Sequence, residues 1–198
     1  MSKPQLRPGD DRDILAAKFE IESEQVLHFK NLYKLMHEWL GEKGYVDPEG
    51  MTDKFESFYF ERTIASTGNQ EHRIWWRAHY IPGNSNYVRY FLKVDFQTLN
   101  AKSVEVMHKG LKFKTNKIDA IVRIEAWLQL DYNNLWKDHW LLKHVDNFFR
   151  KRIYKNFREE HKRELYRHAY EFQQRIKQYL NIKTFEPQPK LFQHRLGM

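Results

Sequence analysis

The run from Ile118 to Leu130 is the feature that most constrains how this chain folds. Apolar residues stand at every second position of the run, and most positions between them are polar or charged. Because successive side chains in a strand point to opposite faces, this period predicts a long strand with one buried face and one face in water. The run indicates a β-sheet and carries no information about chemistry.

Further strands are predicted where apolar residues alternate and turn-forming residues follow. Their expected ranges are Lys18–Ser23, Phe55–Ile64, His72–Ile81, Tyr87–Thr98, Ser103–His108 and Leu111–Lys114. The last two flank Lys109-Gly110, which is a two-residue hairpin signal. Connections this short favour an antiparallel meander, because parallel neighbours need long crossovers.

Helical periodicity appears on either side of the predicted strands. Ser23 is a candidate N-cap for a helix that runs to about Leu40, where Gly41 and Gly44 end it. From Leu135 a first helical segment is expected, with its apolar residues at Trp136, Trp140, Leu141, Val145 and Phe149. A second segment covers roughly Lys151–Leu180, and the sequence leaves open whether the two form one kinked helix or two.

The predicted fold class is α+β: an antiparallel meander of five to seven strands, with the N-terminal helix and the long C-terminal helix packed on one face. This element order resembles the helix-grip layout of START and polyketide-cyclase-like domains, which implies a curved sheet around the last helix. The stretches HKGLKFKTNKI and FRKRIYKNFREEHKRELYRHAYEFQQRIKQYL are similar to a family of uncharacterised archaeal proteins. That resemblance covers most of the chain and implies no activity.

Length and composition favour one folded domain. The chain has 198 residues, of which 41% are apolar and 16% aromatic, enough for a single core rich in large rings. We expect a flexible leader at 1–17, a domain at 18–183 and an extended tail at 184–198. The chain has no cysteine, which excludes disulfides and thiolate chemistry. It shows neither a membrane span nor a signal peptide, so we expect a cytoplasmic protein without a cofactor.

The net charge of +8 is unevenly distributed. Residues 1–134 hold 19 basic and 19 acidic side chains, whereas residues 135–198 hold 15 and 7. This excess predicts an anionic partner for the C-terminal part, such as RNA or a ribonucleoprotein. The candidate contacts share one side of the second helix or lie beside it: Lys151, Arg152, Lys155, Arg158, Lys162 and Arg163. An equally good alternative is a solvated helix face with ordinary ion pairs, for example Glu159 with Arg163.

Trp75 offers a second candidate contact with nucleic acid. In the predicted strand His72–Ile81, Trp75, Arg77 and His79 share one face, while Trp76 shares the other with apolar residues. An exposed Trp beside Arg can stack nucleobases. The alternative, which we favour, is that a helix, the tail or a second subunit covers Trp75.

Metal binding and catalysis have less support. His161, Glu164, His168 and Glu171 lie on one helix side, and both residue types bind metals. We favour instead a histidine pair at the edge of the apolar stripe, so no metal is predicted. The chain lacks both Gly-rich phosphate loops and a G-x-S-x-G elbow, and no catalytic residue is assigned.

These observations predict a non-enzymatic binding domain that uses its basic helix. The alternative is a helix-grip carrier that holds an apolar small molecule between the sheet and the last helix, and an enzyme built on such a cavity ranks third. A contiguous empty pocket there would favour the carrier, and a ring-packed core together with a continuous positive stripe would favour the binding domain.

Overall fold

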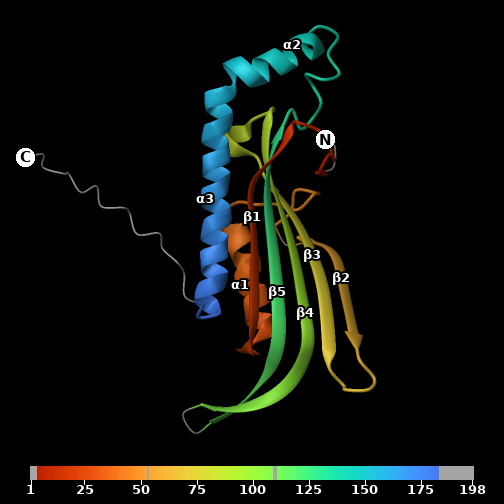
Figure 1. Ribbon diagram of the computed structural model, residues 1–198, viewed down its shortest axis with the longest axis vertical. Helices are drawn as coiled ribbons and strands as arrows, with labels where there is room; N and C mark the ends of the chain where they lie inside the picture. Colours follow the sequence, from red (N-terminus) through yellow and green to blue (C-terminus); the bar gives the residue numbers. More distant parts are fainter. Residues whose placement is uncertain (1–3, 53, 109–110, 183–198) are drawn as a thin grey trace, which may run out of the picture.

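The computed structural model describes residues 4–52, 54–108 and 111–182. They form an α+β domain around a five-stranded sheet with the strand order β1-β5-β4-β3-β2, in which all neighbours are antiparallel (Figure 1). The elements in chain order are β1 (Asp13–Leu27), α1 (Phe29–Glu42), β2 (Glu56–Thr63), β3 (Gln70–Tyr80), a 3₁₀ turn (Pro82–Asn84), β4 (Val88–His108), β5 (Leu111–Leu130), α2 (Leu142–Phe148), a π-helical turn (Phe149–Ile153) and α3 (Lys155–Tyr179). The predicted fold class is confirmed.

Helices α1 and α3 cover the same face of the sheet (Figure 1). The apolar residues of the Ile118–Leu130 run all lie on that face, and none is more than 2% exposed. Helix α3 contacts β1 and β5 and buries one stripe at helical spacing: Leu165, Ala169, Phe172 and Ile176. The long C-terminal helix therefore packs on the strand that the sequence singled out.

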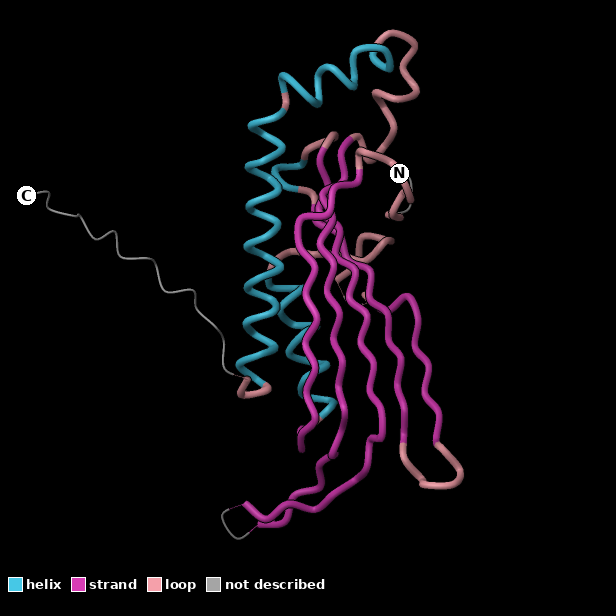
Figure 2. Tube along the Cα trace, viewed as in Figure 1, coloured by secondary structure: helices cyan, strands magenta, loops and turns pink. Residues whose placement is uncertain are grey.

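Strands β4 and β5 are longer than predicted. The expected break after Thr98 is only a register shift between Leu99 and Lys102, at which Asn100 has a φ of 52°. On the partner strand, residues 115–117 stay paired instead of forming a connection. The two strands continue past the rest of the sheet as a curved ribbon (Figure 2). His108 pairs with Leu111, and the predicted hairpin residues Lys109 and Gly110 lie outside the described residues.

The N-terminal part differs from the prediction in two ways. Strand β1 begins at Asp13 instead of Lys18, and Ser23, the expected N-cap, pairs with Ala120 inside that strand. Before the strand, the Arg7 side chain donates to the carbonyl oxygen of Leu130 over 2.9 Å, and Arg12 is 3% exposed. These residues are held against the body of the domain, because two guanidinium groups find acceptors there.

The C-terminal helical region consists of two helices. Tyr154, with ψ of 7°, interrupts the helical backbone between the π-helical turn and α3. Helix α2 begins only at Leu142, later than the expected Leu135, and crosses the upper end of the molecule (Figure 1). The tail predicted at 184–198 lies outside the described residues. None of the described helices is long and apolar enough to cross a bilayer.

The core position of Ile124 gives a test of this packing. Its side chain is 0% exposed, and an unpaired charge buried there costs several kcal/mol, about the whole stability of a small domain. We expect Ile124→Asp to unfold the protein, as measured by circular dichroism and thermal melting.

Ile121→Asp is the matched control, since the half-buried Ile121 lies on the opposite face of the same strand. This variant should remain folded. An Ile124→Asp protein that melts like the wild type would contradict the packing of α3 on β5.

Candidate functional site

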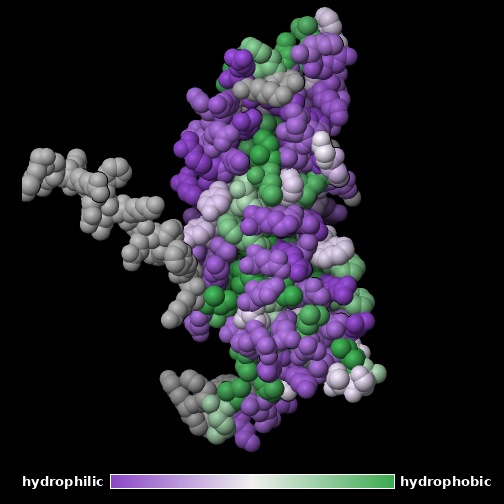
Figure 3. Space-filling view, in the orientation of Figure 1, coloured by the Kyte–Doolittle hydropathy of each residue, from purple (hydrophilic) through white to green (hydrophobic). Residues whose placement is uncertain are grey.

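The basic residues of the C-terminal region surround the beginning of α3. Arg152, Lys155 and Arg163 are exposed, while Arg158 and Lys162 are half-buried against the body. The predicted contact Lys151 lies in the π-helical turn, and its side chain is outside the described part of the structure. Figure 3 shows hydrophilic side chains over the upper part of α3, where these cations lie.

Carboxylates do not neutralise most of these cations. Arg158 forms an ion pair with Glu159 over 2.9 Å, whereas Arg163 reaches only the backbone oxygen of Glu159, over 3.3 Å. The ion pair suggested for Arg163 is therefore wrong. Between residues 152 and 163, all described, four basic side chains have no ion pair: Arg152, Lys155, Lys162 and Arg163.

Three cations line a surface pocket of about 300 Å³ between α3 and the end of the sheet. Arg150 is 9% exposed and forms ion pairs with Asp11 at 2.9 Å and Asp146 at 3.1 Å. Lys162 and Arg158 complete the cationic lining, and Ile14 and Leu130 are its apolar residues. Because Arg150 and Arg158 already have carboxylate partners, Lys162 is the cation of this pocket that is left for an external anion.

Trp75 lies on the face of the sheet opposite α1 and α3, and no described helix covers it. The favoured covering by a helix is therefore wrong, whereas covering by the tail or by a second subunit stays a prediction. Its side chain is 44% exposed, and its ring centroid is 4.4 Å from that of Phe58. Phe60, on the same strand face as Phe58, is 41% exposed. The Arg77 guanidinium is 5.9 Å from the Trp75 ring centroid and forms an ion pair with Asp95 at 2.8 Å.

The sequence did not identify Phe58 and Phe60 as part of this platform. Their alternation in β2 was a usable signal, but it fits a buried strand face equally well. His79, predicted beside Trp75 and Arg77, is only 9% exposed and does not extend the platform.

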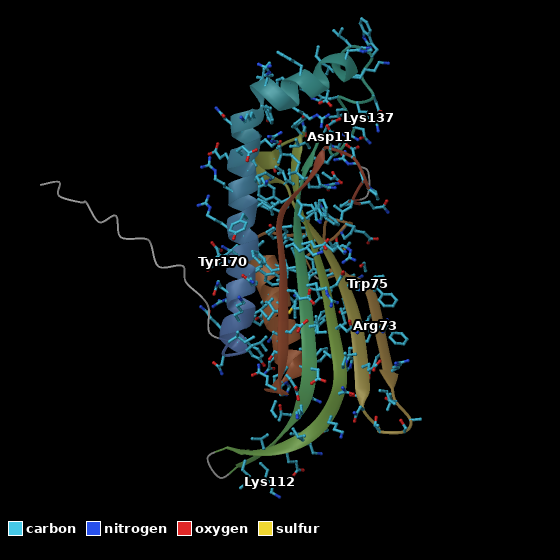
Figure 4. The ribbon with its side chains drawn as sticks, in the orientation of Figure 1. Asp11, Arg73, Trp75, Lys112, Lys137 and Tyr170 are labelled. Carbon is cyan, nitrogen blue, oxygen red and sulfur yellow. The ribbon has the colours of Figure 1, made fainter. Side chains whose placement is uncertain are left out.

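The structure does not bring the two predicted contact regions together. The neighbouring residue Trp76 points into the core that α1 and α3 cover, so Trp75 points to the other face. Figure 4 shows Trp75 and Arg73 on the side of the sheet away from α3. One short ligand segment cannot contact both regions at once.

The metal candidates take part in a cluster with tyrosines. The Tyr90 hydroxyl donates to Glu164 over 2.7 Å and lies 2.6 Å from Nδ1 of His161. Since a hydroxyl has one proton, His161 donates from Nδ1 when Tyr90 donates to Glu164. His168 lies 3.2 Å from the Tyr45 hydroxyl. In the part of the chain that the structure describes, no three acidic or histidine side chains converge as metal ligands.

Burial controls the protonation of this cluster. It lowers the pKa values of His161 and His168, although Glu164 opposes the shift in both. It also raises the pKa of Tyr90, with the hydrogen bond to Glu164 as the next cause. The cluster is therefore uncharged at its imidazoles and phenols near neutral pH, as suits a polar contact between α3 and the sheet.

Aromatic rings fill the space in which a carrier would hold its ligand. Rings from α1 pack on the sheet and on α3 with centroid distances from 4.7 to 5.4 Å: Phe29 with Phe96, Tyr33 with Trp76, and Trp39 with Phe172. This packing favours the binding domain over the carrier.

Comparisons with known proteins give no assignment. No protein-family model matches the chain, and no curated protein sequence shows significant similarity to it. The resemblance to an archaeal family stays an expectation, and the function must be argued from the surfaces described above.

The buried histidines predict how stability depends on pH. Burial lowers the pKa of His79 to about 4, and it lowers those of His72, His161 and His168 as well. Below the unfolded value of about 6.5 the unfolded chain then binds more protons than the folded one. The free energy of unfolding should fall as the pH falls below about 6.5, by up to about 1.4 kcal/mol per pH unit for each histidine until its folded pKa is reached.

Urea unfolding between neutral pH and pH values near 4 measures this dependence. His79→Gln should make it shallower, whereas a control at the exposed His144, His144→Gln, should leave it unchanged. If the free energy of unfolding depended on pH equally in wild type and His79→Gln, His79 would bind its proton with the same affinity in the folded and unfolded states.

Proposed function

We propose that this chain is a non-enzymatic binding domain that engages the phosphates of RNA, alone or within a ribonucleoprotein, through the basic beginning of α3. The observation that carries the proposal is the concentration of cations without an ion pair at Arg152, Lys155, Lys162 and Arg163. Like charges at this spacing on a helix repel one another, which costs stability unless an anion lies between them. A polyanion removes the repulsion and releases its own counterions.

Two carboxylates near these cations already have partners of their own, which supports this proposal. Glu159 pairs with Arg158, and Glu164 accepts a hydrogen bond from Tyr90. Arg167, one turn beyond Arg163, is exposed and extends the cationic surface. We also keep the expectation of a cytoplasmic protein, which agrees with a chain that has no cysteine.

Salt dependence tests the proposal. We expect the combined variant Lys155→Gln, Lys162→Gln, Arg163→Gln and Arg167→Gln to flatten the slope of log K against log salt by up to ~3 to 4 units, less on a single strand. Its melting temperature should hardly change, since exposed charges contribute about 0–1 kcal/mol each. Labelled RNA and DNA oligonucleotides are titrated at several salt concentrations.

A control variant removes the same number of positive charges from α1 and from the end of α3: Lys30→Gln, Lys34→Gln, Arg175→Gln and Lys177→Gln. It should retain most of the salt slope. Equal losses in both variants would mean that the net charge alone attracts nucleic acid, and an absence of wild-type binding at low salt would end the proposal.

The exposed ring pair Phe58–Trp75 supports a second candidate contact, the stacking of nucleobases on the open sheet face. Trp75→Ala should weaken binding of single-stranded RNA by about 1–3 kcal/mol per stacked base and leave the salt slope unchanged. Trp140→Ala, at another exposed tryptophan, is the control for a general loss of aromatic surface. Unchanged affinity in Trp75→Ala would remove the sheet face from the binding site.

A further inference from the structure

The segment around α2 exposes large apolar side chains at one end of the molecule. We call them the α2 apolar surface; its members, with their exposed fractions, are Trp140 (74%), Ile153 (64%), Phe148 (61%), Leu135 (56%), Leu141 (52%) and Val145 (46%). Single exposed apolar residues are ordinary, but a contiguous group of this kind marks a surface that binds something.

Buried contacts fix the orientation of this helix. Its polar side faces the body, because Asp146 and Arg150 are 6% and 9% exposed and form an ion pair of 3.1 Å. Beside them, the rings of Trp136 and Phe149 pack with centroids 4.6 Å apart. Leu141, Val145 and Phe148, at spacings of four and three residues, therefore face outward.

Trp140, Leu141 and Val145, which the sequence groups in one apolar helical segment, therefore lie on the outside of the molecule. The reason is that Arg150 needs Asp146 as well as Asp11, and burying one side of a short helix exposes the other.

Exposed cations surround the α2 apolar surface. Lys137, Lys143, Arg152 and Lys155 are exposed, and none has an ion pair within the described ranges. Figure 3 shows hydrophobic side chains next to hydrophilic ones at the end that carries α2, and Figure 4 places Lys137 there. Apolar rings and aliphatic side chains flanked by Lys and Arg are the composition of segments that lie in a bilayer interface.

The placement of α2 suits a flat partner. The helix runs crosswise to α3 at the end of the elongated molecule (Figure 1). A surface that touches this end meets α2 side-on, while the sheet and α3 extend away from it. Such contact requires no rearrangement of the core.

We propose that the α2 apolar surface docks this protein onto an anionic lipid bilayer, with the apolar side chains in the interface and the lysines and arginines at the lipid headgroups. A second copy of the chain fits less well, because two such surfaces would bring like charges together. The bases of a nucleic acid stack on rings such as Trp140, but they match the aliphatic Leu141 and Val145 less well than acyl chains do. The proposal rests on apolar side chains that the RNA contact does not use, while Arg152 and Lys155 border both surfaces.

The test is co-sedimentation of the full chain with vesicles. Wild type should pellet with equal parts of phosphatidylcholine and phosphatidylserine, and far less with phosphatidylcholine alone, because the lysines and arginines require anionic headgroups. The double variant Trp140→Ser and Phe148→Ser keeps every charge and should lose affinity by roughly tenfold or more, since two large apolar side chains no longer leave water.

The matched control exchanges the same residue types on the open sheet face, Trp75→Ser and Phe58→Ser, and should bind vesicles like wild type. Circular dichroism and thermal melting confirm folding of both. Leu141→Ser with Val145→Ser is the second α2 variant, and should show the same loss if the first one fails to fold.

Three results would overturn the proposal. One is a wild type that does not pellet with anionic vesicles. Another is binding that both α2 variants retain, which would assign the attraction to charge alone. The third is a dimer in sedimentation velocity that the α2 variants abolish without any vesicle binding, which would assign the α2 apolar surface to a second copy of the chain.

Discussion

Burial of the apolar face of β5 is the constraint on which the rest of the structure depends. This strand lies between β1 and β4, so backbone hydrogen bonds on both of its edges are satisfied within the sheet. Its inward side chains, such as Val122 and Ile124, are 0% exposed, and each fully buried aliphatic side chain contributes about 1.5–3 kcal/mol. Helix α3 lies where it can remove this face from water, and that position determines which of its basic residues reach solvent.

Local periodicity explains why so much of the fold could be predicted from the sequence. The alternation in β5 and the helical stripe of α3 are properties of neighbouring residues, and both predictions are confirmed. The errors occur where distant pairing overrides local preference. Ser23 has a good capping side chain, yet the ladder with β5 keeps it in a strand. Likewise, pairing carries β4 through Asn100, where turn chemistry had suggested an end.

The candidate sites were predictable only in part. A sequence shows which residues share one face of a helix or strand, but it does not show which other elements contact that face. Helical spacing put Lys155, Arg158 and Lys162 on one side, but only the structure shows that Arg158 has a carboxylate partner. The ring that supports Trp75 comes from another strand, and cross-strand partners depend on register. For α2, the sequence identified a group of apolar residues, but only the structure shows that the ion pair of Asp146 with Arg150 leaves them facing outward.

The two proposed surfaces meet at the junction of α2 and α3, so RNA and anionic lipid would compete for the cations that lie there. Arg152 and Lys155 are exposed at that junction and border both the α2 apolar surface and the cations of α3. A cation held at a lipid headgroup is no longer available to an RNA phosphate, and two polyanions drawn to one place repel each other. RNA and anionic lipid should therefore weaken each other's binding by the same factor, as linkage requires. The open face at Trp75, on the other side of the sheet, lies outside this competition.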